Sequence, residues 1–280
     1  MTTSRYAPTP ELPAPDALAR IALEAATDAA LLILDRSRSG VAATKSSATD
    51  VVTDMDRQAQ ELLAQTLHAA RPEDAFFGEE GGSAAGSRPI TWVVDPIDGT
   101  VNYVYDIPAY AVSVAAVTGD VHTPGAWRPV AGAVVNPVSG ERFWGATGTG
   151  AWRQRGRHTA MRVRVSTQAD LGLSLIGTGF GYDAEQRARQ ARALTAILPR
   201  VRDIRRFGSA ALDLCHVADG TLDGYYEEGL NPWDMAAGWL LVTEAGGRVE
   251  NRDGGDPEKA MTIAGGACFS HLAELVRTAP

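Results

Sequence analysis

The stretch Ile90–Thr100 reads Ile-Thr-Trp-Val-Val-Asp-Pro-Ile-Asp-Gly-Thr and carries the strongest signal in the 280-residue sequence. Its first half, Ile90–Val94, is a short apolar run rich in β-forming residues, which predicts a buried strand. Asp95 follows where that strand ends, a usual place for a functional side chain in a layered α/β protein. Because Pro96 lacks an N–H and favours an extended Asp95, the corner is expected to be stiff.

The second half of the stretch offers the groups that a metal and a phosphate need. Asp98 is placed to turn its carboxylate to the side of Asp95, with the Ile97 carbonyl between them, and hard oxygen ligands of this kind suit Mg²⁺. Gly99 allows a phosphate oxygen close to the backbone, and the N–H groups of Gly99 and Thr100 are candidates to bind it. The Thr100 hydroxyl is a candidate to orient a water molecule. On its own, such a pattern is more often an Asx turn that caps a helix.

Three further acidic motifs are each weak evidence for a functional site when taken alone. Glu79 and Glu80 follow a short apolar strand that is expected to end in Phe76-Phe77, and they stand in the glycine-flanked segment Gly78–Gly82, which is typical of a solvated acidic turn. Asp234 precedes an apolar helix and has the position of a helix cap. The segment Lys45–Asp56 reads as a charged loop followed by a capped helix start. Only their combination with Ile90–Thr100 points to a site.

In the N-terminal part of the chain, on both sides of Ile90–Thr100, the residue pattern predicts two helices followed by a sheet. Leu18–Leu34 carries an apolar stripe of helical period with Asp16 as its expected cap. A second helix is expected from Thr53–Asp54 until Pro72 stops it, with residues 41–52 as the link between the two helices. β-rich runs then predict strands at Ile90–Val94, Tyr110–Val117, Val130–Val135, Arg142–Ala146 and Met161–Val165.

The C-terminal part alternates between strand and helix, which is typical of an α/β layered structure. Arg202, Arg205 and Arg206 are interpreted there as solvated strand residues, with an anion-binding patch as the alternative. The predicted strands are Ser174–Thr178, Arg202–Phe207, Leu222–Tyr226, Arg248–Glu250 and Thr262–Ala264, and the predicted helices are Ala184–Leu198, Ser209–Ala218, Trp233–Glu244 and Ser270–Arg277.

The length and the absence of a long linker predict one catalytic unit over residues 16–280, made of two subdomains at about 16–165 and 166–280. Residues 1–15 carry four prolines and are expected to form a flexible tail. The fold class expected for the unit is mixed α/β in layers.

Composition excludes several classes of protein. The apolar content of 45 % is enough for a core, and the formal net charge of −8 argues against general electrostatic binding of nucleic acid. Two cysteines are too few for a disulfide framework or a four-cysteine zinc site, which favours a reducing compartment. No export signal or membrane-spanning stretch stands out, so we expect a cytoplasmic protein without a membrane partner.

Taken in order, these motifs resemble the inositol monophosphatase family of magnesium-dependent phosphatases. The resemblance runs from about residue 17 to residue 275 and rests on the segments Trp92–Thr100, Gly208–Ala211, Val217–Gly220, Asp223–Glu227 and Trp233–Gly238. It implies a layered αβαβα sandwich, hydrolysis of a phosphate monoester, inhibition by lithium and a homodimer.

The same resemblance implies a role for each acidic residue of the motifs. Glu79, Asp95 and the Ile97 carbonyl would hold a first Mg²⁺; Asp95, Asp98 and Asp234 a second; and Glu79 would lie near a third, loosely held ion. Thr100 and Glu79 would orient and activate the attacking water. Asp56 would hydrogen-bond Thr100, and Lys45 would be an electrostatic neighbour of the site.

Substrate contacts follow from the resemblance and from side-chain chemistry. The residues expected to bind substrate are Asp98, Gly99, Thr100, Gly208, Ser209, Ala210, Glu227 and Asp234. A carboxylate such as Glu227 accepts hydrogen bonds from two adjacent hydroxyls, which suits a cyclitol or a sugar. An exposed acid at a strand end is the simpler alternative for Glu227.

The favoured reaction is therefore hydrolysis of inositol 1-phosphate to inositol and phosphate. Fructose 1,6-bisphosphate, histidinol phosphate and 3′-phosphoadenosine nucleotides are the alternative substrates. An alternative of another class is an interaction protein that keeps the fold and binds a transcription or RNA complex.

Overall fold

A computed structural model describes residues 13–35, 41–44 and 51–280. The described helices are α1 (Pro15–Leu34), α2 (Asp54–Ala70), α3 (Thr100–Val104), α4 (Ala184–Ile197), α5 (Ala210–Ala218), α6 (Pro232–Glu244) and α7 (Phe269–Thr278). The described strands are β1 (Val41–Thr44), β2 (Val51–Thr53), β3 (Ala75–Gly78), β4 (Ile90–Asp98), β5 (Ala111–Gly119), β6 (Trp127–Val135), β7 (Glu141–Ala146), β8 (Gly150–Arg155), β9 (Met161–Arg162), β10 (Leu175–Thr178), β11 (Asp203–Arg205), β12 (Gly224–Glu227), β13 (Arg248–Glu250) and β14 (Thr262–Gly265).

The larger of two main sheets has the strand order β3-β4-β5-β6-β7-β8-β9, in which β3 and β4 are parallel and every later pair is antiparallel. Both faces of its central strands are buried. On β4, for example, Trp92 and Val94 pack toward one core while Val93 packs toward the other. This two-sided burial explains why β4 and β5 are nearly continuous apolar runs.

The smaller sheet has the order β11-β10-β12-β14-β13, with β10 parallel to both β11 and β12 and antiparallel pairing elsewhere. Its strands are short, and its β10 and β12 end beside each other because Thr178 pairs with Tyr226. The carboxyl ends of parallel neighbours lie at one edge of a sheet, so the residues after β10 and at the end of β12 face the same space.

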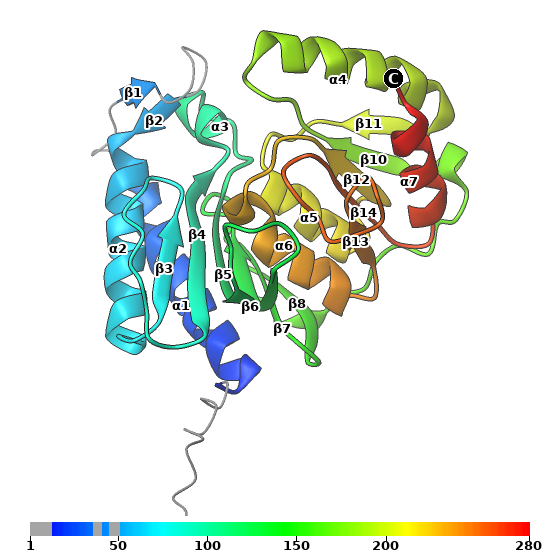
Figure 1. Cartoon of the computed structure of the whole chain (residues 1–280). Helices are drawn as coiled ribbons and strands as arrows, with labels where there is room; N and C mark the ends of the chain where they lie inside the picture. The colour runs from blue at the N-terminus through cyan, green and yellow to red at the C-terminus, as the bar shows by residue number, and fades with distance from the viewer. Residues whose placement is uncertain (1–12, 36–40, 45–50) are drawn as a thin grey trace, which may run out of the picture.

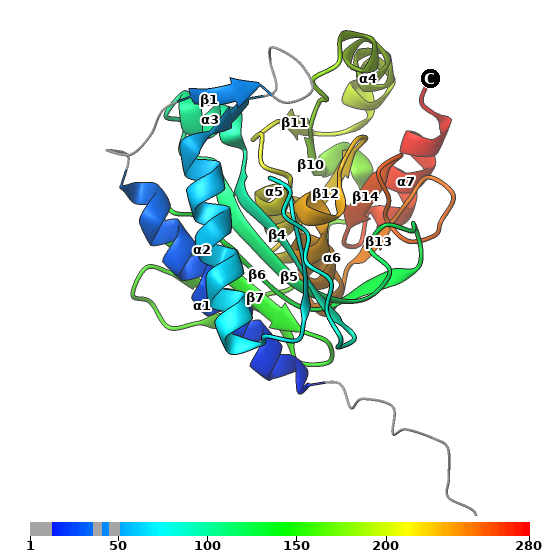
Figure 2. The same cartoon turned by 60° about the vertical axis from the view of Figure 1, so that its left-hand side comes forward.

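Helices and sheets alternate in five layers (Figure 1). Helices α1 and α2 cover the outer face of the large sheet, α5 and α6 lie between the two sheets, and α4 and α7 cover the outer face of the small sheet. In the turned view of Figure 2, α1 and α2 lie on the side away from the small sheet. The expected αβαβα layering is confirmed.

Most predicted helices and strands are present, with differences at their ends. Helix α2 begins as expected, because Thr53 caps it and forms a capping box with Asp56. Asp16 does not cap α1, since proline is accepted at the first helical position and the helix already begins at Pro15, after Ala14. The strand expected at Met161–Val165 stops at Arg162, and the N–H of Val165 instead donates to the Ala245 carbonyl.

Two strand regions were not predicted. Strand β8 ends in Arg153, Gln154 and Arg155, whose polar side chains hide the alternation expected of a strand. The expected link at residues 41–52 contains β1 and β2, which pair antiparallel. No helix within the described ranges has the length and apolar character needed to cross a bilayer.

The predicted tail at residues 1–15 lies mostly outside the described residues, and Pro15 already belongs to α1. All strands of the large sheet precede residue 165 and all strands of the small sheet follow it. The division into two subdomains near that residue remains a prediction.

Candidate metal centre and catalytic cleft

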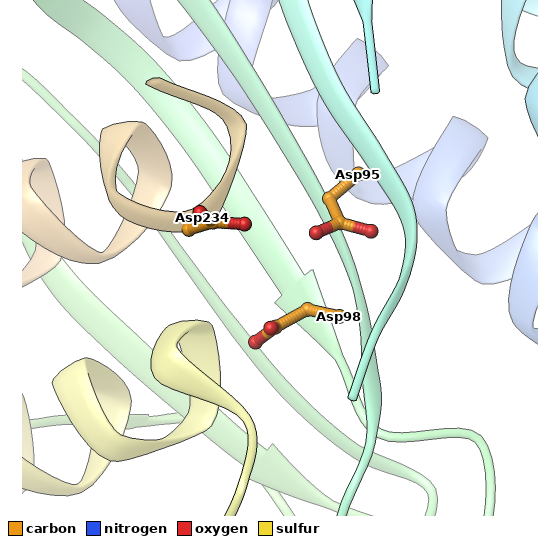
Figure 3. Close-up of side chains that lie close together, drawn as sticks. All are labelled: Asp95, Asp98 and Asp234. Atoms are coloured by element: carbon orange, nitrogen blue, oxygen red, sulfur yellow. The ribbon is translucent and has the colours of Figure 1, made fainter. Parts of the chain in front are cut away.

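Three acidic side chains from two elements meet at the end of β4 (Figure 3). Asp95 and Asp98 come from β4, and Asp234 comes from the first turn of α6. One carboxylate oxygen from each lies within 4.8 Å of the others. Asp95 is 1 % exposed and Asp98 is 8 % exposed, so these charges are withdrawn from water.

A β-bulge brings the two β4 carboxylates to one side. Asp95 pairs with Ser113 and Asp98 pairs with Ala111, so Pro96 and Ile97 together face the single residue between them on β5. In a regular strand, residues three apart point to opposite faces. The extra residue of the bulge changes that alternation and allows both side chains to face the cleft.

Hydrogen bonds fix each carboxylate of this trio. Oδ2 of Asp98 accepts from Ser209 Oγ at 2.6 Å and from the Ala211 N–H at 2.7 Å, in the first turn of α5. Oδ2 of Asp234 accepts from the Asn231 N–H at 2.7 Å, and Oδ1 of Asp95 accepts from the Ile97 N–H at 3.0 Å. The three side chains are therefore ordered before any ligand arrives.

Burial and mutual repulsion of the three carboxylates favour the binding of a cation among them. Burial raises the pKa of Asp95 well above its usual value, and repulsion by Glu79, Asp98 and Asp234 raises it further. Burial raises the pKa of Asp98 to about 6, although the hydrogen bonds from Ser209 and Ala211 oppose that rise. The pKa of Asp234 is raised well above its usual value by burial and by Asp98. Clustered oxygen ligands with these properties fit a divalent cation.

Glu79 borders the same space from the loop after β3. It is half-buried, and its N–H donates to the Val94 carbonyl at 3.2 Å. Gln60 of α2 holds the loop from behind, because its Oε1 accepts from the Glu80 N–H at 2.8 Å and its Nε2 donates to the Gly81 carbonyl at 2.7 Å. Gln60 was not predicted as part of the site. Its position one helical turn after Asp56, on the same face of α2, is the only sequence signal for it.

Thr100 stands at the start of α3 with two acceptors for one hydroxyl hydrogen. Its Oγ1 lies 3.1 Å from Asp56 Oδ1 and 3.0 Å from the Ile97 carbonyl oxygen. Asp56 is fully buried, and its Oδ2 accepts from the Thr53 N–H at 2.7 Å. The two lone pairs of the Thr100 oxygen are therefore left to accept hydrogen bonds from another partner. Lys45 lies outside the described residues, so its role beside the site remains a prediction.

A cleft of about 450 Å³ surrounds these groups, a size within the range of about 300–1,000 Å³ typical of small-molecule sites. Asp56 is not part of its lining and reaches it through Thr100. The predicted residues that line it are Glu79, Asp95, Ile97, Asp98, Gly99, Thr100, Gly208, Ser209, Ala210, Glu227 and Asp234. Segments that are far apart in the chain therefore line the same cleft.

Glycine is required where two loops of the cleft touch. Gly99 has a φ of 97°, and a Cβ there would lie 2.9 Å from the Gly208 carbonyl oxygen. Asn102 joins the same loops, since its Nδ2 donates to the carbonyls of Ala109 at 2.6 Å and Phe207 at 2.7 Å. The predicted phosphate-binding turn is therefore held against the predicted leaving-group wall.

Glu227 lies at the end of β12, where the Tyr225 hydroxyl donates to its Oε2. Burial raises the pKa of Glu227 to about 7, while the hydrogen bond from Tyr225 lowers it. Glu227 is thus a cleft residue and not an exposed strand end.

Several residues of the cleft were missed because they become neighbours only in the folded chain. Arg206, interpreted as a solvated strand residue, lines the cleft, and so does Lys259, whose Nζ donates to Asn231 Oδ1 at 3.0 Å. Gly179 and Phe180, which follow β10, also line it. No local motif marks any of these four.

Comparison with known proteins gives consistent results. The inositol monophosphatase family profile matches residues 14–279. The chain is 46 % identical over 248 residues to the inositol-1-monophosphatase SuhB of Mycobacterium tuberculosis, covering 85 % of this chain and 82 % of that protein. It is 37 % identical over 239 residues to the Nus factor SuhB of Xylella fastidiosa, covering 82 % of each chain.

Among solved structures, the extragenic suppressor protein SuhB of Bartonella henselae superposes with a TM-score of 0.83 at 34 % identity, covering 94 % of this chain and 99 % of that one. With the family profile matching nearly the whole length and with a relative at 46 % identity, this chain belongs to the inositol monophosphatase family.

Proposed function

We propose that this protein hydrolyses phosphate monoesters with the help of Mg²⁺, and that inositol 1-phosphate is its preferred substrate. The observation that carries the proposal is the trio Asp95, Asp98 and Asp234, whose oxygens converge within 4.8 Å in a cleft. Family membership supports the phosphatase reaction. Support for inositol 1-phosphate comes from the Mycobacterium tuberculosis relative, which is named inositol-1-monophosphatase.

The metal ligands of the proposal are oxygen atoms. Glu79, Asp95 and the Ile97 carbonyl would hold one ion, and Asp95, Asp98 and Asp234 a second, with a third ion near Glu79. Bound Mg²⁺ lowers the pKa of water and stabilises negative charge on a departing oxygen. Oxygen-only donors and raised carboxylate pKa values fit this ion, because its binding relieves the repulsion among buried acids.

Thr100 and Glu79 would prepare the water that attacks phosphorus. Because the Thr100 hydrogen is directed to Asp56 or to the Ile97 carbonyl, the free lone pair of its Oγ1 can accept a hydrogen from water. The Glu79 carboxylate is the second acceptor and the base that takes the proton. Held between these two acceptors, a water molecule is oriented for in-line attack.

The phosphate and the alcohol would occupy opposite ends of the cleft. The N–H groups of Gly99 and Thr100 would bind phosphate oxygens, while Ser209, Ala210 and Glu227 would face the leaving alcohol together with Gly208, Asp98 and Asp234. Polar groups along that wall favour an alcohol with several hydroxyls. We further propose that the enzyme acts as a cytoplasmic homodimer and is inhibited by lithium, as expected for its family.

A phosphate-release screen tests the proposal. Wild-type protein is assayed on inositol 1-phosphate, fructose 1,6-bisphosphate, histidinol phosphate and 3′-phosphoadenosine nucleotides, with and without Mg²⁺. We expect Mg²⁺-dependent release that is fastest with inositol 1-phosphate. A higher rate with one of the other esters would reassign the substrate, and no release from any ester would overturn the phosphatase itself.

A second candidate function is suggested by the name Nus factor carried by the Xylella fastidiosa relative. In that case, the fold would also bind a partner of the transcription machinery. Asp95→Asn separates the two functions, because it removes one negative charge from the proposed metal centre and leaves the surface unchanged. If Asp95→Asn loses hydrolysis but still binds a transcription complex, both functions are supported. If the variant retains hydrolysis, the proposed metal centre is refuted.

A further inference from the structure

The Glu227 carboxylate is held from one side by Tyr225. The two residues are two apart on β12, so their side chains lie on the same face of the small sheet. Tyr225 is fully buried in the core between the sheets, and its hydroxyl donates to Oε2 of Glu227. A buried ring with one hydrogen-bond partner makes a rigid support.

Gly179 covers the carboxylate from another side. A Cβ on Gly179 would lie 1.9 Å from Oε2 of Glu227, 2.1 Å from Cδ and 2.2 Å from Oε1, distances that no real side chain adopts. Gly179 is not among the glycines with a positive φ. Glycine is therefore required at this position for space, and not for an unusual backbone conformation.

The two carboxylate oxygens of Glu227 differ in their hydrogen bonding. Oε2 is engaged by Tyr225, whereas Oε1 accepts no hydrogen bond from any residue that the structure describes. Glu227 lines the catalytic cleft, on the wall where the leaving alcohol is expected. A carboxylate has about four lone-pair sites, so Oε1 has all of its acceptor capacity left, whereas Oε2 shares its capacity with Tyr225.

We propose that Gly179 and Tyr225 are specificity-determining positioning residues, which fix Glu227 so that its Oε1 binds one hydroxyl of the substrate alcohol. The inference rests on the phosphatase function proposed above. Cyclitol and sugar phosphates gain a charge-assisted hydrogen bond in this arrangement, and phosphate esters without such a hydroxyl do not. Selection among alcohols thus depends on residues that never touch the phosphate.

Steady-state kinetics on two esters test the proposal. Wild type, Tyr225→Phe and Gly179→Ala are assayed with inositol 1-phosphate and with phenyl phosphate, and selectivity is the ratio of the two kcat/KM values. Because a mispositioned carboxylate weakens one charge-assisted hydrogen bond, we expect selectivity to fall by about tenfold in both variants, mainly through KM for inositol 1-phosphate. Tyr225→Phe keeps the shape of the ring, so it tests the idea even if Gly179→Ala folds poorly.

Tyr226→Phe is the matched control. Tyr226 is the next residue of β12, but its side chain packs in the core on the other face of the small sheet. The same loss of a hydroxyl there is expected to leave selectivity as in wild type. An equal fall in Tyr226→Phe would indicate a general effect on the strand and would overturn the proposal.

A double-mutant cycle separates positioning from a purely structural role. In a Glu227→Ala background, neither Tyr225→Phe nor Gly179→Ala should lower selectivity further, because the group through which both act is gone. A further fall of the same size, or single variants within about twofold of wild type, contradicts the inference. A wild-type protein that releases no phosphate from either ester refutes the proposed function instead, so the two failures are distinguishable.

Discussion

Oγ1 of Thr100 and Oδ1 of Asp56 lie 3.1 Å apart, although 44 positions separate the two residues in the chain. The contact joins the first turn of α2 to the turn that follows β4, and both of its members are buried. Since the same turn of α2 is closed by a capping box, Asp56 has little freedom to move. Thr100 is thereby held in one orientation toward the cleft.

The first prediction concerns the Thr100 hydroxyl. Thr100→Val keeps the shape of the side chain but removes the oxygen that would orient water, so kcat for phosphate release should fall by about a hundredfold with a small change in KM. Thr100→Ser retains the hydroxyl and is the control, with activity close to wild type. A Val variant with the kcat of wild type would exclude the hydroxyl from the reaction.

The second prediction concerns stability without metal. The pKa of Asp95 is raised in the folded state, so folding retains a proton that the unfolded chain releases above about pH 4. Stability of the metal-free protein should therefore fall as pH rises from about 5 to about 8. Asp95→Asn should raise Tm at the upper end of that range and flatten the dependence, as measured by thermal unfolding in a chelator.

Metal addition provides the complementary measurement. A cation that binds only the folded state stabilises it by about 2.7 kcal/mol at about a hundred times its Kd. Mg²⁺ should raise Tm of wild type, and of the exposed control Glu185→Gln, but have little effect on Asp95→Asn. An equal rise in all three proteins would place the ion elsewhere.

The third prediction is a pH dependence of substrate binding. Burial raises the pKa of Glu227 to about 7, so its carboxylate is mostly charged only above that pH. KM for inositol 1-phosphate, taken relative to KM for phenyl phosphate, should fall as pH rises from about 6 to about 8. Glu227→Gln should remove this dependence, because its amide does not titrate. A dependence unchanged in the variant would assign the titration to another group.

The fourth prediction concerns Gln60, which holds the loop that carries Glu79. Gln60→Ala removes the hydrogen bonds to the Glu80 N–H and the Gly81 carbonyl of that loop, which should cost about 0.5–1.5 kcal/mol of stability for each bond. The Mg²⁺ concentration for half-maximal activity should also rise, because Glu79 loses its support. Gln65→Ala, at an exposed contact of the same helix, is the control for both readouts.

The parts of the site that could be predicted from sequence are those encoded locally. Asp95, Asp98 and Thr100 stand together after a recognisable apolar strand, and Asp234 stands before a recognisable apolar helix. Residue types suited to metal binding are therefore found at predictable ends of secondary-structure elements. A layered α/β structure could be predicted from the apolar segments, since continuous apolar strands require cover on both faces, whereas the αβαβα order was implied by the resemblance to the family.

The remaining parts depend on contacts between distant segments. Arg206 looks like a solvated residue until the loop after β11 folds against the cleft. Gly179 has no local reason to be glycine, and only the approach of Glu227 from another strand explains it. Strand β8 was missed because its polar end carries no clear alternation. Such features require the three-dimensional arrangement.

The bulge in β4 has a consequence for how the site would respond to substitution of Ile97. Because Pro96 and Ile97 share one partner position, Ile97 is not paired in the ladder with β5, and its carbonyl turns to the Thr100 hydroxyl at the border of the cleft. The Ile97 side chain itself is packed in the core beneath α1 and α2. A point mutation at this position would alter packing and leave the oxygen in place. One of the donors proposed for the cation is therefore a backbone oxygen, and its place depends on the bulge and not on which side chain stands at position 97.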